Sequence, residues 1–225
     1  MKRCIGIAIA ALLAAGCKAP PTRTAPPASS PARPSQLVEQ WAAAVAEDAR
    51  RSDHENSAQV RAQLADDANR NAQACLDQSP QADACLYYHG IALGLSARAH
   101  PLHAADSLES MLAALAAAEA ANPALDQAGP ARVQALVLIK APAWPLGPGD
   151  PEAGLAAARR AVSLQPLYPP NELALAEALV KNGDAAGARQ TYARARELIR
   201  ALPPSADRDD WLRQADQALA AGSPP

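Results

Sequence analysis

The sequence contains no phenylalanine, and aromatic residues make up only 3% of its 225 positions. It has no run with the alternating apolar and polar pattern of a half-buried strand. Its apolar runs are all shorter than the ~20 residues that a membrane-spanning helix needs. The net charge of −2 gives no broad basic surface, so a nucleic-acid-binding function is not expected.

Catalytic motifs are also lacking. The chain has no HExxH, no phosphate-binding glycine loop and no Ser/His/Asp arrangement. His100 and His103 flank Pro101 and Leu102 without a carboxylate at set spacing, and we interpret this stretch as a solvated loop. Asp66 and Asp67 are adjacent on an expected helix, so their side chains point about 100° apart. The sequence therefore predicts a binding function, with no catalytic site, metal or cofactor.

The N-terminus carries a basic start and a short apolar run, which together predict a secretory signal over residues 1–16. The stretch Leu13-Ala14-Ala15-Gly16-Cys17 resembles the lipobox of bacterial lipoproteins. That resemblance implies that Cys17 is acylated and becomes the mature N-terminus. The alternative is an ordinary signal peptide that happens to contain a cysteine. Lys18 follows Cys17, and by resemblance to enterobacterial sorting this favours the outer membrane, with the domain facing the periplasm.

Residues 17–34 are rich in Pro, Ala, Ser and Thr, and we expect them to form the lipidated end and an extended tether. Residues 35–221 are long enough for one domain with a real core. Residues 222–225 are expected to be a disordered tail.

Alanine dominates the domain, which favours closely packed helices. A 34-residue period relates Gly149-Asp150 to Gly183-Asp184, and aligned positions carry small or large apolar residues: Gly154 with Ala188, Ala158 with Tyr192, Ala161 with Ala195, and Leu164 with Leu198. This pattern is similar to the tetratricopeptide (TPR) repeat. We therefore predict an all-α, tetratricopeptide-like helix-pair solenoid. The last helix, about 206–220, has Trp211 and Leu212 on one face and is expected to be a C-terminal capping helix.

Two cysteines flank an expected break between helices. Cys75 falls in the last turn of one helix and Cys85 in the first turns of the next, with Ser79-Pro80 between them. This arrangement can bring the cysteines within bridging distance, and the expected compartment permits disulfides. We predict a structural disulfide. A redox or metal site is the alternative, although no further ligands lie at suitable spacing.

The loop 141–150 replaces the tight turn of an ordinary repeat with a Pro/Gly-rich stretch that carries Trp144. Trp144 is a candidate for contact with a ligand or partner, and the alternative is that it fills a gap between repeats. We expect stacked helix pairs to leave a concave surface. Four further candidates for that surface lie on the first helices of pairs: Tyr87, Tyr88, Glu172 and Glu177.

The segment from Cys75 to Leu198 resembles a more specific family. Its elements are Cys85-Leu86-Tyr87-Tyr88, Asn122-Pro123, the loop Ala141-Pro142-Ala143-Trp144-Pro145, and Tyr168-Pro169-Pro170-Asn171-Glu172. Together they look like the T-component, a TPR lipoprotein associated with TRAP-type transporters. The resemblance implies a periplasmic lipoprotein that meets a solute-binding protein and carries an apolar ligand. The alternative is a general TPR scaffold in envelope assembly or secretion. The sequence leaves open whether copies of the chain associate.

Overall fold

The computed structural model describes residues 34–221. The predictions of a signal peptide, of lipidation at Cys17, of a tether and of a C-terminal tail concern residues outside this range. Within it the chain forms helices and no β-strand beyond one isolated bridge between Ala143 and Gly149. The helices are α1 (Pro34–His54), α2 (Ala58–Gln78), α3 (Asp83–Ala99), the short 3-10 helix η1 (Pro101–His103), α4 (Ala104–Ala121), α5 (Leu125–Lys140), α6 (Pro151–Leu164), α7 (Pro169–Lys181), α8 (Ala185–Arg200) and α9 (Ala206–Ala221).

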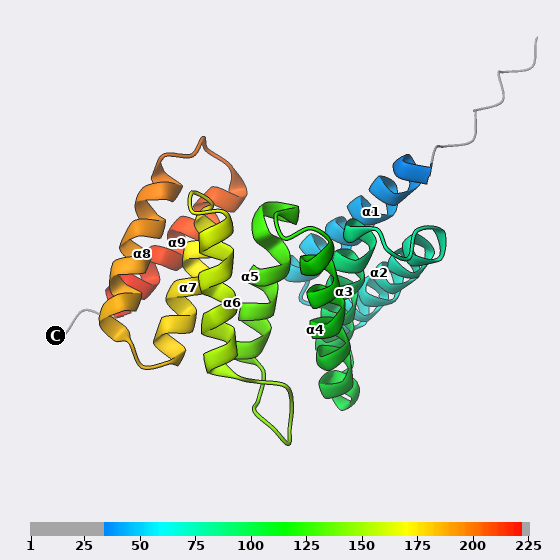
Figure 1. Cartoon of the computed structure of the whole chain (residues 1–225), viewed down its shortest axis with the longest axis horizontal. Coiled ribbons are helices and arrows are strands. Elements are labelled where there is room, and N and C mark those ends of the chain that lie inside the picture. The colour runs from blue at the N-terminus through cyan, green and yellow to red at the C-terminus, as the bar shows by residue number, and fades with distance from the viewer. Residues whose placement is uncertain (1–33, 222–225) are drawn as a thin grey trace, which may run out of the picture. The chain divides into compact units, whose positions relative to one another are not determined.

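Consecutive helices pack as pairs: α1 with α2, α3 with α4, α5 with α6, and α7 with α8. Figure 1 shows α5 to α8 side by side, with the long loop between α5 and α6 extending beyond the helix ends. The first helices of successive pairs also touch, as α1 does with α3 and α5 with α7. Helix α9 covers α8 and reaches α7, which agrees with the prediction of a C-terminal capping helix.

The 34-residue period corresponds to α6 and α8, whose first residues are 34 positions apart. Asp150 and Asp184 cap these helices, because their side chains accept hydrogen bonds from the amides of Ala153 (3.0 Å) and Gly187 (2.8 Å). The first three aligned pairs are buried: Gly154 with Ala188, Ala158 with Tyr192, and Ala161 with Ala195. The fourth pair is not in the core, since Leu164 is exposed and Leu198 is only half-buried.

Helix α5 opens with an unusual left-handed turn. Asp126, Gln127 and Ala128 have φ values of 46°, 54° and 63°, a region that costs free energy for residues other than glycine. Arg132 donates hydrogen bonds to the carbonyls of Asp126 (3.1 Å) and Gln127 (3.2 Å), and so holds the turn. The right-handed part of α5 begins at Gly129-Pro130, where the proline ring supplies a helix-compatible φ.

Cys75 and Cys85 form a disulfide that joins α2 to α3, with their Cα atoms 5.3 Å apart. Both side chains are buried. One local prediction needs correction. The stretch from His100 to His103 was expected to be a loop, but it contains the helical turn η1, and α4 follows directly at Ala104. Pro101 at the first position of η1 supplies a helix-compatible φ, which starts the turn early.

Two features are absent from residues 34–221. No helix there is both long enough and apolar enough to cross a membrane. In the same range, no group of three or more His, Cys, Asp or Glu side chains is arranged to hold a metal ion.

Candidate functional site: an apolar groove beside the Trp144 loop

The packing of the helices opens between the second and third pairs. Helices α3 and α4 pack along their length, as do α5 and α6, but α3 meets α5 at only a few positions. The space left there is a groove of about 730 Å³ lined by α1, α3, α4 and α5. This volume lies within the range of small-molecule sites. We call it the α3–α5 groove.

The lining of the α3–α5 groove is almost entirely apolar. Only three of its residues are charged, namely Asp53, Arg98 and Lys140, and all three lie near the ends of their helices. An interior of this kind offers no fixed hydrogen-bonding group, so it selects for apolar surface. The large aliphatic side chains of the lining are Ile91, Leu95, Leu108, Met111, Val133, Leu136 and Val137.

The charged residues of the groove are already paired. Arg98 donates hydrogen bonds to Asp53 Oδ1 (2.8 Å) and to Ser52 Oγ (2.5 Å). Lys140 Nζ lies 2.9 Å from Glu177 Oε2. Arg98 and Lys140 are both substantially exposed, so these pairs add little stability. The two ion pairs keep the net charge beside the apolar lining low, and they do not block the groove.

Gly94 helps to keep the groove open. A Cβ atom at this position would lie 2.9 Å from Met111 Sδ, closer than side-chain carbons approach. The missing side chain therefore leaves room for Met111 and for the space beside it. Met111 is a long, flexible thioether that adapts to differently shaped apolar partners.

The loop that carries Trp144 lies at one end of this groove, since Ala141 and Pro142 belong to both. Three backbone hydrogen bonds hold the loop, from Leu146 to Ala143 (3.0 Å), from Gly149 to Pro142 (2.9 Å) and from Asp150 to Leu138 (2.9 Å). Trp144 is 87% exposed and Leu146 is 75% exposed. Trp144 therefore does not fill a gap between repeats, which was one of the two interpretations left open by the sequence.

The two tyrosine candidates belong to the core. Tyr87 is buried, and its hydroxyl donates a hydrogen bond to Asp126 Oδ2 (2.7 Å). Burial, together with the nearby Asp126 carboxylate, raises the pKa of Tyr87 well above its usual value. Tyr88 is half-buried, with its ring edge-on to that of Tyr87 at 5.0 Å. Tyr87 thus anchors the turn that opens α5 and presents no open binding surface, contrary to the expectation.

The two glutamate candidates also serve packing. Glu172 is 2% exposed. Its Oε1 lies 3.0 Å from Arg194 Nε as an ion pair, although the angles are not those of a hydrogen bond. Burial raises the pKa of Glu172, and Arg194 offsets part of that effect. Glu177 accepts a hydrogen bond from Gln214 (2.7 Å) besides its pair with Lys140. Neither glutamate lines the α3–α5 groove.

Of the sequence candidates, only Trp144 lies exposed beside the groove. The groove residues themselves were missed as a site, because Leu108, Met111, Val133 and Val137 have the helical spacing of ordinary core residues. The spacing of apolar residues along the sequence does not indicate that α3 and α5 lie apart.

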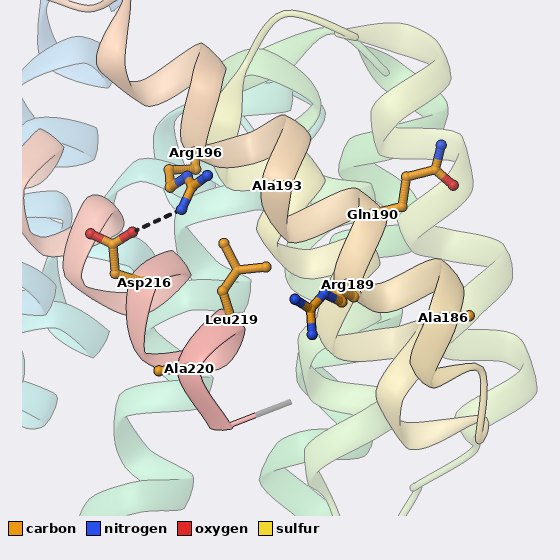
Figure 2. Close-up of a pocket in the computed structure, with 8 residues that line it drawn as sticks. All are labelled: Ala186, Arg189, Gln190, Ala193, Arg196, Asp216, Leu219 and Ala220. Carbon is orange, nitrogen blue, oxygen red and sulfur yellow. Dashed lines mark ion pairs between the residues drawn. The ribbon is translucent and has the colours of Figure 1, made fainter. Parts of the chain in front are cut away.

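A second hollow lies between α8 and α9, and Figure 2 shows it. Leu219 points between the two arginines of the hollow, Arg189 and Arg196, and Arg196 lies 3.7 Å from Asp216. This hollow has about 640 Å³ and is bounded by two helices only. It mixes charged and alanine side chains, so it lacks the continuous apolar lining of the α3–α5 groove.

No protein-family model matches the sequence, and no curated protein sequence matches it. Among solved structures, the chain is similar to a thermophilic TPR protein of Thermus thermophilus. The similarity has a TM-score of 0.54 and 22% sequence identity, and it covers 83% of this chain and 97% of that one. At this identity the likeness concerns the fold alone. The chain has a TPR-like, helix-pair solenoid fold.

Proposed function

We propose that this protein is a periplasm-facing lipoprotein that is anchored through Cys17 and binds an apolar ligand, or an apolar segment of a partner, in the α3–α5 groove. The observation that carries the proposal is the groove itself: about 730 Å³ with aliphatic side chains from four helices. The lipobox-like stretch at the N-terminus supports the anchor and the location at the outer membrane. We propose no catalytic reaction, because each charged side chain that lines the groove is already paired with another residue.

The more specific form of the proposal is an accessory role, like that of a T-component, in a TRAP-type solute transport system. Its support is the sequence resemblance over Cys75 to Leu198, together with an apolar groove large enough for a small ligand. The partner would be a periplasmic solute-binding protein. The exposed Trp144 and Leu146 favour the second candidate as well, a scaffold that docks another envelope protein.

The groove is tested with a neutral apolar fluorophore, N-phenyl-1-naphthylamine, titrated into the purified full chain. We expect saturable binding with one site per chain. The variant Gly94→Leu places a side chain in the groove and should weaken binding at least tenfold. Ala186→Leu adds the same side chain to the exposed hollow between α8 and α9 and is the matched control. Equal binding by wild type and Gly94→Leu, with both folded by circular dichroism, would refute the groove as the site.

The anchor and the partner need separate measurements. Mass spectrometry of the mature N-terminus should find acyl chains on Cys17 in the wild type and none in the variant Cys17→Ala, and a wild-type N-terminus without acyl chains would contradict the lipoprotein interpretation. A cross-linked pull-down from the native envelope, with mass spectrometry, identifies the partner. Recovery of a periplasmic solute-binding protein supports the transporter role. Recovery of outer-membrane or secretion components supports the scaffold instead.

A further inference from the structure

Large apolar side chains are exposed mainly at one end of the helix pairs. Six such residues are exposed in the range 34–221. Two of them, Leu164 and Leu167, lie at the turn between α6 and α7. The other four lie at turns from the first to the second helix of a pair, and we call them the apolar edge: Leu102 (96% exposed), Trp144 (87%), Leu146 (75%) and Val180 (56%).

The turns of the apolar edge are neighbours in space. The α3–α5 groove brings the end of α3, the start of α4 and the end of α5 together, at Arg98, Ala104 and Pro142. A smaller hollow joins the end of α5, at Lys140, to the end of α7, at Val180. One end of the groove therefore lies at the apolar edge. Exposed apolar residues scattered singly need no explanation, but four on one side, beside an apolar groove, do.

The edge residues are held outward by their turns. Hydrogen bonds and three prolines fix the loop that carries Trp144 and Leu146, and both of these side chains are exposed. Leu102 sits on η1, which is closed by a hydrogen bond from the amide of His103 to the carbonyl of His100 (3.0 Å). Because these side chains do not fold back onto the domain, their apolar surface is available to another phase or molecule.

We propose that the apolar edge docks on the surface of a lipid bilayer, so that the groove opens toward the membrane. A tryptophan on a rigid tip suits the membrane–water interface, where its ring lies among the headgroups. Leucine tips add apolar area that enters the acyl boundary. Lys140 and Arg98 lie on the same side but are paired with Glu177 and Asp53, so the docking depends on apolar contact and not on charge. This proposal rests on the proposed membrane anchoring, and it adds that the groove exchanges its apolar cargo with the bilayer.

The length of the chain allows this arrangement. Helix α1 begins at Pro34, and its residues near the groove, Ala49 and Asp53, lie close to its other end. At 1.5 Å per residue, α1 separates its start from the edge side by roughly 30 Å. The sequence places the 16 residues 18–33 between Cys17 and α1, and 16 residues at ~3.1 Å each can span up to roughly 50 Å. A chain anchored at Cys17 can therefore bring the edge to the same membrane.

The test uses the full mature chain with Cys17→Ser, so that no acyl anchor contributes, and vesicles of phosphatidylethanolamine and phosphatidylglycerol at 3:1. Co-sedimentation gives the partition coefficient. We expect binding, a blue shift of tryptophan emission, and loss of that shift in Trp144→Ser. The double variant Leu102→Ser/Leu146→Ser should bind about twentyfold more weakly, from about fivefold for each leucine that is partly buried.

The matched control is Leu167→Ser, because Leu167 is 74% exposed but lies at the turn between α6 and α7, at the other end of α6. It should leave vesicle binding unchanged. No vesicle binding by the wild-type domain, or an equal loss in Leu167→Ser, overturns the proposal. So does protection of the edge by a protein partner without any vesicle binding. If the double variant still binds N-phenyl-1-naphthylamine, the groove is intact, and a failure of membrane docking leaves the proposed function standing.

Discussion

Removal of the disulfide between Cys75 and Cys85 gives the prediction with the most direct calculation. The bond closes a loop with a sequence separation of 10 residues. In the chain-entropy model, a cross-link over such a loop lowers the entropy of the unfolded chain by about 9 cal/mol/K, or about 2.7 kcal/mol at 25 °C. For a domain of this size, 1 kcal/mol shifts the melting temperature by about 2–4 °C. We therefore expect Cys75→Ala/Cys85→Ala to melt about 5–11 °C below the wild type.

The assay is thermal unfolding followed by circular dichroism, on the mature chain with Cys17→Ser. Wild-type protein that is unfolded, reduced and refolded under reducing conditions is the control. It should melt close to the double variant, because both lack the cross-link. Any remaining difference between the two measures the loss of the two buried sulfur atoms. A difference below about 2 °C between oxidised wild type and double variant would refute the entropic argument. Two free thiols by mass spectrometry would refute the bond itself.

Three further predictions concern two buried polar residues, Asn171 and Glu172, and the half-buried Glu119. Asn171 is fully buried and bonds to the carbonyls of Gln127 (3.0 Å), Ala161 (3.1 Å) and Gln165 (3.2 Å); Asn171→Ala should lower the free energy of unfolding in urea by about 3 kcal/mol, and a loss below about 1 kcal/mol would contradict this role. Burial raises the pKa of Glu172 despite Arg194. The stability that protonated Glu172 adds is therefore present below its ordinary pKa and is lost as pH rises through the pKa of the folded state. Glu172→Gln should gain stability relative to wild type between pH 4 and pH 7, and a difference in unfolding free energy that does not change with pH would contradict this. Burial alone would raise the pKa of Glu119, but hydrogen bonds from Arg160 and Gln134 lower it overall. The stability that Glu119 adds is therefore present above its ordinary pKa and is lost as pH falls. Glu119→Gln should lower the free energy of unfolding by about 1 kcal/mol at pH 7 and leave it unchanged near pH 3, whereas a loss that persists at pH 3 would show that the charge of Glu119 is irrelevant.

Much of the fold could be predicted from local signals in the sequence. Asp150-Pro151 begins α6 because an aspartate cap and a proline both favour a helix start. The 34-residue period placed Gly154 and Ala188 at helix contacts, and the structure gives the reason: a Cβ on Gly154 would lie 2.6 Å from Ile139 Cγ2. The positions of Cys75 and Cys85 at facing helix ends were likewise apparent, since the break at Pro80 separates the two helices.

The candidate site was less predictable, because side chains with the same spacing can be core or surface. Tyr87 and Glu172 were expected on a concave face, but their polar atoms are partnered by Asp126 and Arg194 from other helices. Partners so far apart in the chain have no signal in a single sequence. The left-handed turn of residues 126–128 was also not foreseen, because none of its residues is glycine and its stability depends on Arg132 and Asn171.

The sequence by itself determined most of the helices and their pairing, since caps, prolines and small residues act within one or two turns of the chain. It did not show the turn η1 or the left-handed start of α5. Only the tertiary structure decided where the pairs separate. Met111 remains buried in the core and Val137 packs against the same cluster, and the separation between α3 and α5 makes one side of that cluster the floor of a groove. The sequence also left open whether Trp144 is buried or exposed. The structure shows it exposed, on a loop that is held by hydrogen bonds to its own base and to the end of α5 and not by packing between repeats.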